Sequence, residues 1–277
     1  MAQPGIICAS FFHDLPTMKP AVVLLHSSMS SKSQWSSLKA QLGDAYRCIP
    51  VDLQGYGASP FPADAGDDYT HTLAHEVDAV VASIAAELEP GEAFHLIGHS
   101  FGGACALHMA RRMPQRVLSL TLFEPVAFHL LPDGHPAKVE IVDVVGGITT
   151  CASDRDATRI FIDYWNRGGA FDVATASAQD KMVSQIAKVK LDFQALLDEP
   201  ATLDDLSMLT MPTLVMAGER SPASTRLLVE QLGESLPNAT LLKLRTAHMG
   251  PITHGAIVNP AITGFLSGLE VVTAGAA

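Results

Sequence analysis

The sequence predicts an α/β fold: a mostly parallel, doubly wound sheet with a helical cap inserted between two of its strands. Short apolar runs alternate with helical patterns before residue 125 and after residue 210. These runs are continuous, which is typical of strands buried on both faces. Between them no strand flanked by turn signals is found. The chain therefore divides into a core, residues 1–125 and 208–277, and a helical cap, residues 126–207.

The first part of the core alternates strand and helix candidates. Apolar residues recur at helical spacing from Leu73 to about Leu88; Thr70 or Thr72 can cap this helix, and the Pro90-Gly91 pair ends it. The other elements are assigned from short apolar runs and the turn residues around them. The expected strands are 6–12, Ala21–His26, 47–53, Phe94–Gly98 and Leu118–Phe123, and the other expected helices are Ser36–Leu42 and Ala104–Met113.

The cap is expected to be all helical. Its second helix is rich in aromatic residues, Phe161, Tyr164 and Trp165, which either line an apolar acyl pocket or pack in the core. An insertion after a strand lies over the carboxyl edge of the sheet, where such folds have their sites. The expected cap helices are 137–150, 154–167 and one or two within 175–198; after the cap come strand Thr213–Ala217, helix Ser224–Leu236, strand Ala239–Leu244, helix Ile257–Leu269 and a loose tail, 271–277.

Composition excludes several classes of function. The net charge of −11 argues against a nucleic-acid partner. There is no G-x-G-x-x-G or P-loop motif, so no nucleotide cofactor is expected. His71 and His75 are four residues apart on a helix, but no third ligand is near, so we expect no metal site.

The sequence also bears on location. The N-terminus has no basic segment followed by an apolar one, and no apolar stretch reaches transmembrane length, so neither a signal peptide nor a membrane partner is expected. The four cysteines are scattered without a C-x-x-C motif, which predicts reduced thiols and a cytoplasmic protein. They are Cys8, Cys48, Cys105 and Cys151.

The segment G-H-S-F-G at 98–102 joins an expected strand to an expected helix. A G-x-S-x-G pattern in this setting predicts a nucleophile elbow rather than a simple glycine-rich turn. Ser100 occupies a turn too tight for an ordinary backbone, so the residues two before and two after it must be small, and both are glycine. The N–H of Phe101, at the start of the helix, is the expected first oxyanion donor.

A serine nucleophile needs a base, usually histidine held by a carboxylate. His248 follows the last strand and is preferred as the base, with His254 second. In such folds the acid usually follows the penultimate strand, here Thr213–Ala217, with the spacing G-x-x-D. That spacing places Ser221 where the aspartate would be, and a serine hydroxyl cannot carry the negative charge that stabilises an imidazolium. Glu124, at the end of the strand after the elbow helix, is therefore preferred, with Glu219 as the runner-up.

The second oxyanion donor is expected in the serine-rich loop after the first central strand. The second residue beyond His26 is Ser28, and its N–H is chosen. Ser27 occupies a position in this loop where glycine would fit more easily. We expect His26 to hold this loop through side-chain hydrogen bonds.

These residues resemble the α/β-hydrolase family, in its capped single-domain branch, over nearly the whole chain. The resemblance implies the α/β-hydrolase fold. Haloalkane dehalogenases carry the acid after the earlier strand, which favours Glu124, but they use an aspartate nucleophile, so Ser100 argues against dehalogenase and epoxide-hydrolase chemistry. The matching segments are L-L-H-S-S at 24–28, V-D-L-Q-G-Y-G-A-S at 51–59, G-H-S-F-G-G at 98–103, P-T-L-V-M-A-G-E at 212–219 and A-H-M-G-P at 247–251.

The combined prediction is a serine hydrolase that acts on small carboxylic esters or similar acyl substrates through an acyl-enzyme, without cofactor or metal. A carbon–carbon bond hydrolase and a cofactor-free perhydrolase are alternatives on the same triad, and a small-ligand receptor is the non-enzymatic alternative. The expected partner is a small acyl substrate, and the sequence does not indicate the oligomeric state. The site residues are Ser100, His248 and Glu124, with Phe101 and Ser28 as oxyanion donors.

Overall fold

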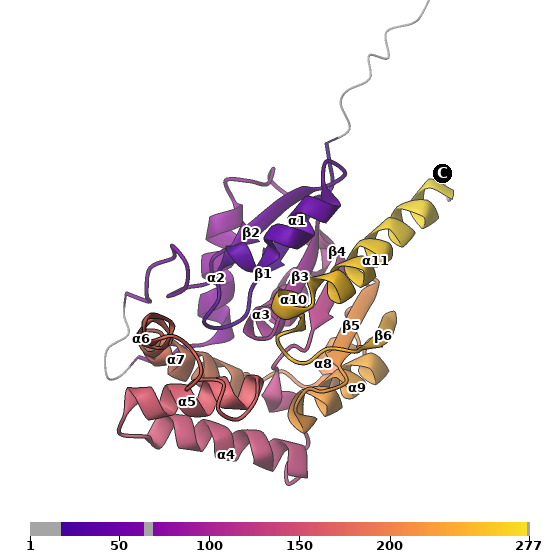
Figure 1. Cartoon of the computed structure of the whole chain (residues 1–277). Coiled ribbons are helices and arrows are strands. Elements are labelled where there is room, and N and C mark those ends of the chain that lie inside the picture. Colours follow the sequence, from indigo (N-terminus) through magenta and orange to yellow (C-terminus); the bar gives the residue numbers. More distant parts are fainter. Residues whose placement is uncertain (1–17, 64–68, 276–277) are drawn as a thin grey trace, which may run out of the picture.

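The computed structural model describes residues 18–63 and 69–275, and these form a six-stranded sheet flanked by helices (Figure 1). Every pair of neighbouring strands is parallel, which confirms the predicted α/β architecture. The edge strand expected at 6–12 lies outside the described residues. In spatial order the strands are β2 (Arg47–Val51), β1 (Ala21–Leu25), β3 (Phe94–His99), β4 (Val117–Phe123), β5 (Thr213–Gly218) and β6 (Ala239–Leu244).

Helices cover both faces of the sheet because strand side chains alternate between two apolar clusters. Val22 and Leu24 of β1 belong to one cluster, which includes side chains of α1 and α11. Val23 and Leu25 belong to the other, which includes side chains of α2, α3 and α9. Burial on both faces explains why these strands are continuous apolar runs. The helices are α1 (Ser36–Leu42), α2 (Leu73–Ile84), α3 (Phe101–Arg112), α9 (Ala223–Ser235) and α11 (Gly255–Gly275).

The described chain between β4 and β5 contains helices and loops but no strand. Figure 1 shows α4 to α7 gathered at one end of the sheet. Apolar side chains of α4, α5 and α7 join the larger core cluster. The segment expected to hold one or two helices, 175–198, holds two. The limits of a separate cap, 126–207, stay a prediction. The helices are α4 (Pro136–Thr150), α5 (Asp154–Trp165), α6 (Ala176–Val183), α7 (Ile186–Leu197) and α8 (Leu203–Leu206).

Several element ends differ from the prediction. Helix α11 runs on to Gly275, so the loose tail expected from residue 271 is wrong for 271–275; no glycine or proline stands at 270–274 to stop the helix. Helix α2 ends at Ile84, before Leu88. Within the described ranges, no helix is both long and apolar enough to cross a membrane. The short helices, which were not predicted, are η1 (Lys32–Trp35), η2 (Pro114–Arg116), η3 (Phe128–Leu130) and α10 (Gly250–Thr253).

Candidate active site

Ser100 stands alone between β3 and α3, on a strained turn. Its φ of 56° and ψ of −123° place a non-glycine residue at positive φ, which costs on the order of 1–3 kcal/mol. A Cβ on Gly98 would lie 2.4 Å from the carbonyl oxygen of Gly102, and a Cβ on Gly102 would lie 2.4 Å from the carbonyl oxygen of His26. Both glycines are therefore required because a side chain at either position would collide with backbone atoms. The turn begins α3 at Phe101, three residues earlier than expected.

Three predicted residues meet at this turn in a chain of hydrogen bonds. His248 Nε2 lies 2.9 Å from Ser100 Oγ, and His248 Nδ1 lies 2.7 Å from Glu124 Oε2. All three side chains are buried. Because a carboxylate only accepts hydrogen bonds, Nδ1 carries the proton and Nε2 is free to accept from the serine hydroxyl. This is the arrangement in which a histidine can remove the proton of a serine.

The carboxylate of Glu124 is held at the end of β4 by the backbone of the neighbouring strand. Its φ is 43°, its N–H donates to Met216 O at 2.9 Å, and its Oε1 accepts from the N–H of Gly218 at 2.5 Å. The runner-up, Glu219, is exposed, and no hydrogen bond joins it to His248 among the described residues. The geometry therefore brings Glu124 to the histidine, although Glu219 is next to Gly218 in sequence.

The other candidates from sequence lie beside this constellation. The second-ranked base, His254, is half-buried, and its Nδ1 lies 2.7 Å from Thr253 Oγ1. Ser221, in the usual place of the acid, is buried, and its hydroxyl has no hydrogen-bond partner among the described residues. Neither residue joins the hydrogen bonds of Ser100.

Two further side chains position His248, and sequence reasoning did not identify either role. The Nε2–H of His99 donates to the carbonyl oxygen of His248 at 2.9 Å. Complete burial, with the nearby charge of His248, lowers the pKa of His99 well below its ordinary value, so this ring stays neutral. The indole of Trp165 stacks on the His248 ring with centroids 4.0 Å apart. The only sequence signal for Trp165 was its place in an aromatic helix.

The two expected oxyanion donors have N–H groups without a protein acceptor among the described residues. Phe101 is the first residue of α3, so its N–H has no partner within the helix. No backbone or side-chain acceptor is found for the N–H of Ser28. His26 holds this loop as expected: its Nδ1–H donates to Ser27 O at 2.7 Å, and its Nε2 accepts from the N–H of Leu53 at 3.0 Å. Burial lowers the pKa of His26 to about 4, so it is neutral at pH 7.

A cavity of about 260 Å³ adjoins Ser100 and His248. Among the aromatic residues of α5, Phe161 and Trp165 line it, whereas the hydroxyl of Tyr164 is bonded to Glu140 and Ser224 instead. Helix α5 of the insertion thus forms part of the cavity wall. The other apolar lining residues are Met29, Ile162, Ala170, Met182, Met249 and Ile252.

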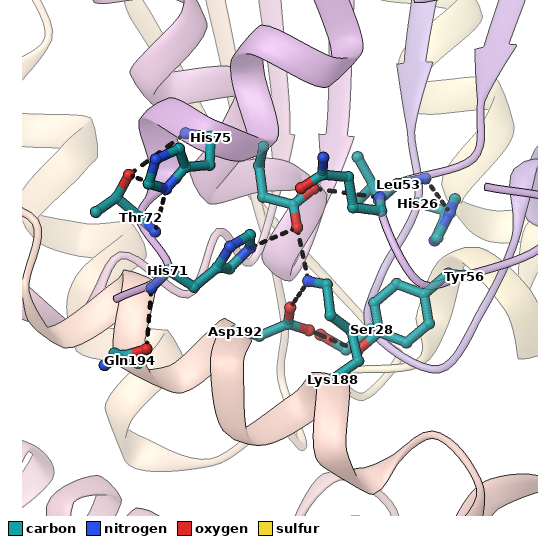
Figure 2. A network of polar contacts seen from close by, with 12 residues as sticks. His26, Ser28, Leu53, Tyr56, His71, Thr72, His75, Lys188, Asp192 and Gln194 are labelled. Carbon is teal, nitrogen blue, oxygen red and sulfur yellow. Dashed lines mark hydrogen bonds and ion pairs between the residues drawn. The ribbon is translucent and has the colours of Figure 1, made fainter. Parts of the chain in front are cut away.

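A buried network of charged and polar groups contacts Ser28 of the serine-rich loop (Figure 2). Lys188 of α7 bridges Asp192 of the same helix and Glu76 of α2, and all three are at most 1% exposed. His71 Nε2 lies 2.8 Å from Glu76 Oε1. The ring of His75, the other member of the possible metal pair, contacts Thr72 at the start of α2. Both histidines therefore make hydrogen bonds within the protein.

Comparisons with known proteins agree with this architecture. A model described as the alpha/beta hydrolase family matches residues 22–259. The cis-3-alkyl-4-alkyloxetan-2-one decarboxylase of Shewanella oneidensis is 35% identical over 120 residues, 43% of this chain and 36% of that protein. The 3-oxoadipate enol-lactonase 1 of Acinetobacter baylyi is 27% identical over 214 residues, 76% of this chain and 74% of that protein.

Solved structures give the same result for the fold. A hydrolase from Pseudomonas aeruginosa superposes with a TM-score of 0.71 at 22% identity, covering 90% of each chain. At this identity the likeness concerns the fold alone. The chain also spans little more than a third of the length of the decarboxylase, 36%.

Proposed function

The chain belongs to the alpha/beta hydrolase family, and on that premise we propose that it is a serine hydrolase that cleaves small carboxylic esters through an acyl-enzyme. The observation that carries the proposal is the continuous path Ser100–His248–Glu124, with hydrogen bonds of 2.9 and 2.7 Å. Ser100, Glu124 and His248 come from separate segments of the sequence, and their buried side chains meet beside the cavity. Hydrolase relatives support the reaction class, and the substrate is our own inference.

In the proposed reaction, His248 takes the proton of Ser100 as its Oγ attacks the ester carbonyl. The N–H groups of Phe101 and Ser28 hold the oxyanion of the tetrahedral intermediate, and each donor contributes about 3 kcal/mol to lowering the barrier. The C–O bond then breaks, and His248 returns the proton to the leaving alcohol. Water, deprotonated by His248, attacks the acyl-enzyme, and the acid leaves with Ser100 restored.

The size and lining of the cavity favour a small, largely apolar acyl group. Its volume of about 260 Å³ is slightly below the range of about 300–1,000 Å³ that is usual for small-molecule sites. In this proposal the methionine and aromatic side chains of the cavity contact the acyl group, whereas Ser28 and His248 contact the reacting ester bond. An enol-lactonase among the relatives is consistent with an ester-like bond, because a lactone is a cyclic ester.

The test is the time course of p-nitrophenol release from p-nitrophenyl acetate. We expect a burst equal to the enzyme concentration, followed by slower turnover, and an acetyl mass increase on the peptide that contains Ser100. Absence of both, together with tight binding of the ester, would favour the small-ligand receptor instead. Added hydrogen peroxide checks the perhydrolase alternative, since that enzyme transfers the acyl group to peroxide.

A second cavity, of about 420 Å³, suggests a preference for acyl groups that end in an anion. It shares Trp165 and Met249 with the first cavity, so the two adjoin. Arg167, Arg220 and His254 line it, and no Asp or Glu is among its described lining residues. Neither arginine side chain has a carboxylate partner within the described ranges. A carboxylate at the far end of the acyl chain would therefore find cationic groups there.

We expect mono-p-nitrophenyl succinate to have a lower KM than p-nitrophenyl butyrate, which has a methyl group in place of the terminal carboxylate. Arg220→Gln should raise the KM for the succinate by about fivefold, as for an exposed ion pair, and leave the butyrate unchanged. The matched control is Arg226→Gln, since Arg226 lines a different cavity. Equal effects of Arg220→Gln on both esters would contradict the preference without affecting ester hydrolysis itself.

A further inference from the structure

Helix α7 of the insertion contacts both residues that we expect to donate to the oxyanion. Lys188 and Asp192 are one turn apart on this helix, and both side chains are buried. Asp192 accepts a hydrogen bond from the side chain of Ser28, and the Lys188 ammonium lies over the ring of Phe101. Figure 2 shows Lys188, Asp192 and Ser28 close together.

The contact to Ser28 is short and buried. Asp192 Oδ2 accepts from Ser28 Oγ–H at 2.6 Å and from Tyr56 O–H at 2.6 Å. Its other oxygen accepts from the ammonium of Lys188. The carboxylate thus has partners on both oxygens, and it links the serine-rich loop to α7 over a sequence separation of 164 residues.

The ammonium of Lys188 completes this link. Its Nζ lies 2.6 Å from Glu76 Oε1 and 4.9 Å from the centroid of the Phe101 ring. Burial acts to lower the pKa of Lys188, but the charges of Asp192 and Glu76 outweigh it and raise that pKa, so the group stays an ammonium. A buried charge network with every member paired has few alternative arrangements, because breaking one pair leaves a charge unpaired in the interior.

The loop itself needs such an anchor. Met29, next to Ser28, has a φ of 56°, a strained value for a residue with a side chain. Strain of this kind persists only where surrounding contacts hold the backbone. An oxyanion donor must also be held within about 0.5 Å of its productive place. The bond from the Ser28 hydroxyl to Asp192 is the contact that ties this residue to the rigid interior.

We propose that Asp192, held by Lys188, is a positioning residue for the oxyanion hole, so that α7 must be docked before Ser28 can stabilise the transition state. The inference rests on the proposed serine hydrolase function. It gives the insertion a second role beside lining the cavity. A purely structural role for Asp192 would affect the stability of the fold and leave the transition state untouched.

Two matched substitutions separate these roles, because each removes one hydroxyl that donates to the same oxygen at the same distance. Ser28→Ala keeps the oxyanion N–H but loses its anchor, and should lower kcat about tenfold with KM unchanged, a part of the loss caused by deleting a donor. It should weaken the binding of a trifluoromethyl ketone, which forms an oxyanion on Ser100, by the same factor. Tyr56→Phe should leave kcat and the inhibitor constant unchanged.

A double-mutant cycle tests whether Asp192 acts through Ser28. Asp192→Ala should lower kcat as Ser28→Ala does, and the double variant should lose no more than either single one. Thermal unfolding and titration of Ser100 with a phosphonate ester correct for misfolded protein. Equal kcat losses in Ser28→Ala and Tyr56→Phe, or no loss in Ser28→Ala, would overturn the proposal. A wild-type chain that neither cleaves the ester nor reacts with the phosphonate would instead overturn the hydrolase function.

Discussion

Replacing Ser100 with alanine should lower kcat for p-nitrophenyl acetate by about 10⁵- to 10⁶-fold, the loss typical of a missing triad nucleophile. No other described hydroxyl is hydrogen-bonded to His248 Nε2, which lies 2.9 Å from Ser100 Oγ. The variant cannot form an acyl-enzyme, so the burst should disappear together with the steady-state rate. Stopped-flow absorbance measures the burst and the steady-state release of p-nitrophenol. Intact-protein mass spectrometry independently detects the acyl-enzyme.

The fold should survive this change, because alanine removes only one oxygen from the strained turn. The matched control is Ser221→Ala, since Ser221 is also buried and its hydroxyl has no partner among the described residues. That variant should keep the wild-type kcat. A Ser100→Ala variant that still releases p-nitrophenol in a burst would show that another group is the nucleophile.

The elbow could be predicted from sequence because its constraints are local. Gly98 and Gly102 are required by contacts within a few residues and with the neighbouring strand, and the pattern records both. Continuous apolar runs likewise predicted the parallel sheet, since burial on both faces leaves no polar positions in a strand such as β1. The candidates for the proposed acid could be reduced to Glu124 and Glu219, because a serine at 221 cannot carry a negative charge.

The contacts that could not be predicted join segments far apart in the chain. The stacking of Trp165 on His248 depends on how α5 docks over the sheet, which no local pattern records. Lys188 and Asp192 have the spacing of an ordinary exposed helical ion pair, and their burial becomes visible only when Glu76 and Ser28 are brought against them. Helix α11 extends beyond residue 270 because no glycine or proline stands at 270–274 to end it.

The second large effect is expected for Glu124→Gln, which should lower kcat by about 10⁴-fold through the tautomer of His248. The N–H of Gly218 donates to Glu124 Oε1, so the amide oxygen of glutamine should take that position. The amide nitrogen then faces His248 Nδ1 and donates to it. This places the imidazole proton on Nε2, which can no longer accept a proton from Ser100.

Glu219→Gln is the matched control, because it makes the same chemical change at the other candidate acid, which is exposed. It should leave kcat unchanged, and the opposite pattern in the two variants would reassign the acid to Glu219. The kcat of both variants is measured with one ester as a function of pH. The wild-type and Glu219→Gln profiles should coincide at every pH, whereas Glu124→Gln should remain about 10⁴-fold slower across the range.

A relocated carboxylate should restore part of the lost activity. Ser221 Oγ lies 2.8 Å from where a Cβ on Gly218 would be, and Gly218 N–H is the group that holds Glu124. Adding Ser221→Asp to Glu124→Gln puts a negative charge beside the backbone of Gly218. Position 221 is where the usual G-x-x-D spacing would place the acid. We expect at least a tenfold gain in kcat over Glu124→Gln, because the aspartate competes with the glutamine amide for His248 Nδ1 and, as a charged acceptor, favours the proton on that nitrogen. If the double variant stays as inactive as Glu124→Gln, the carboxylate must approach the histidine from the end of β4, and the strained φ of 43° at Glu124 is then part of what catalysis requires.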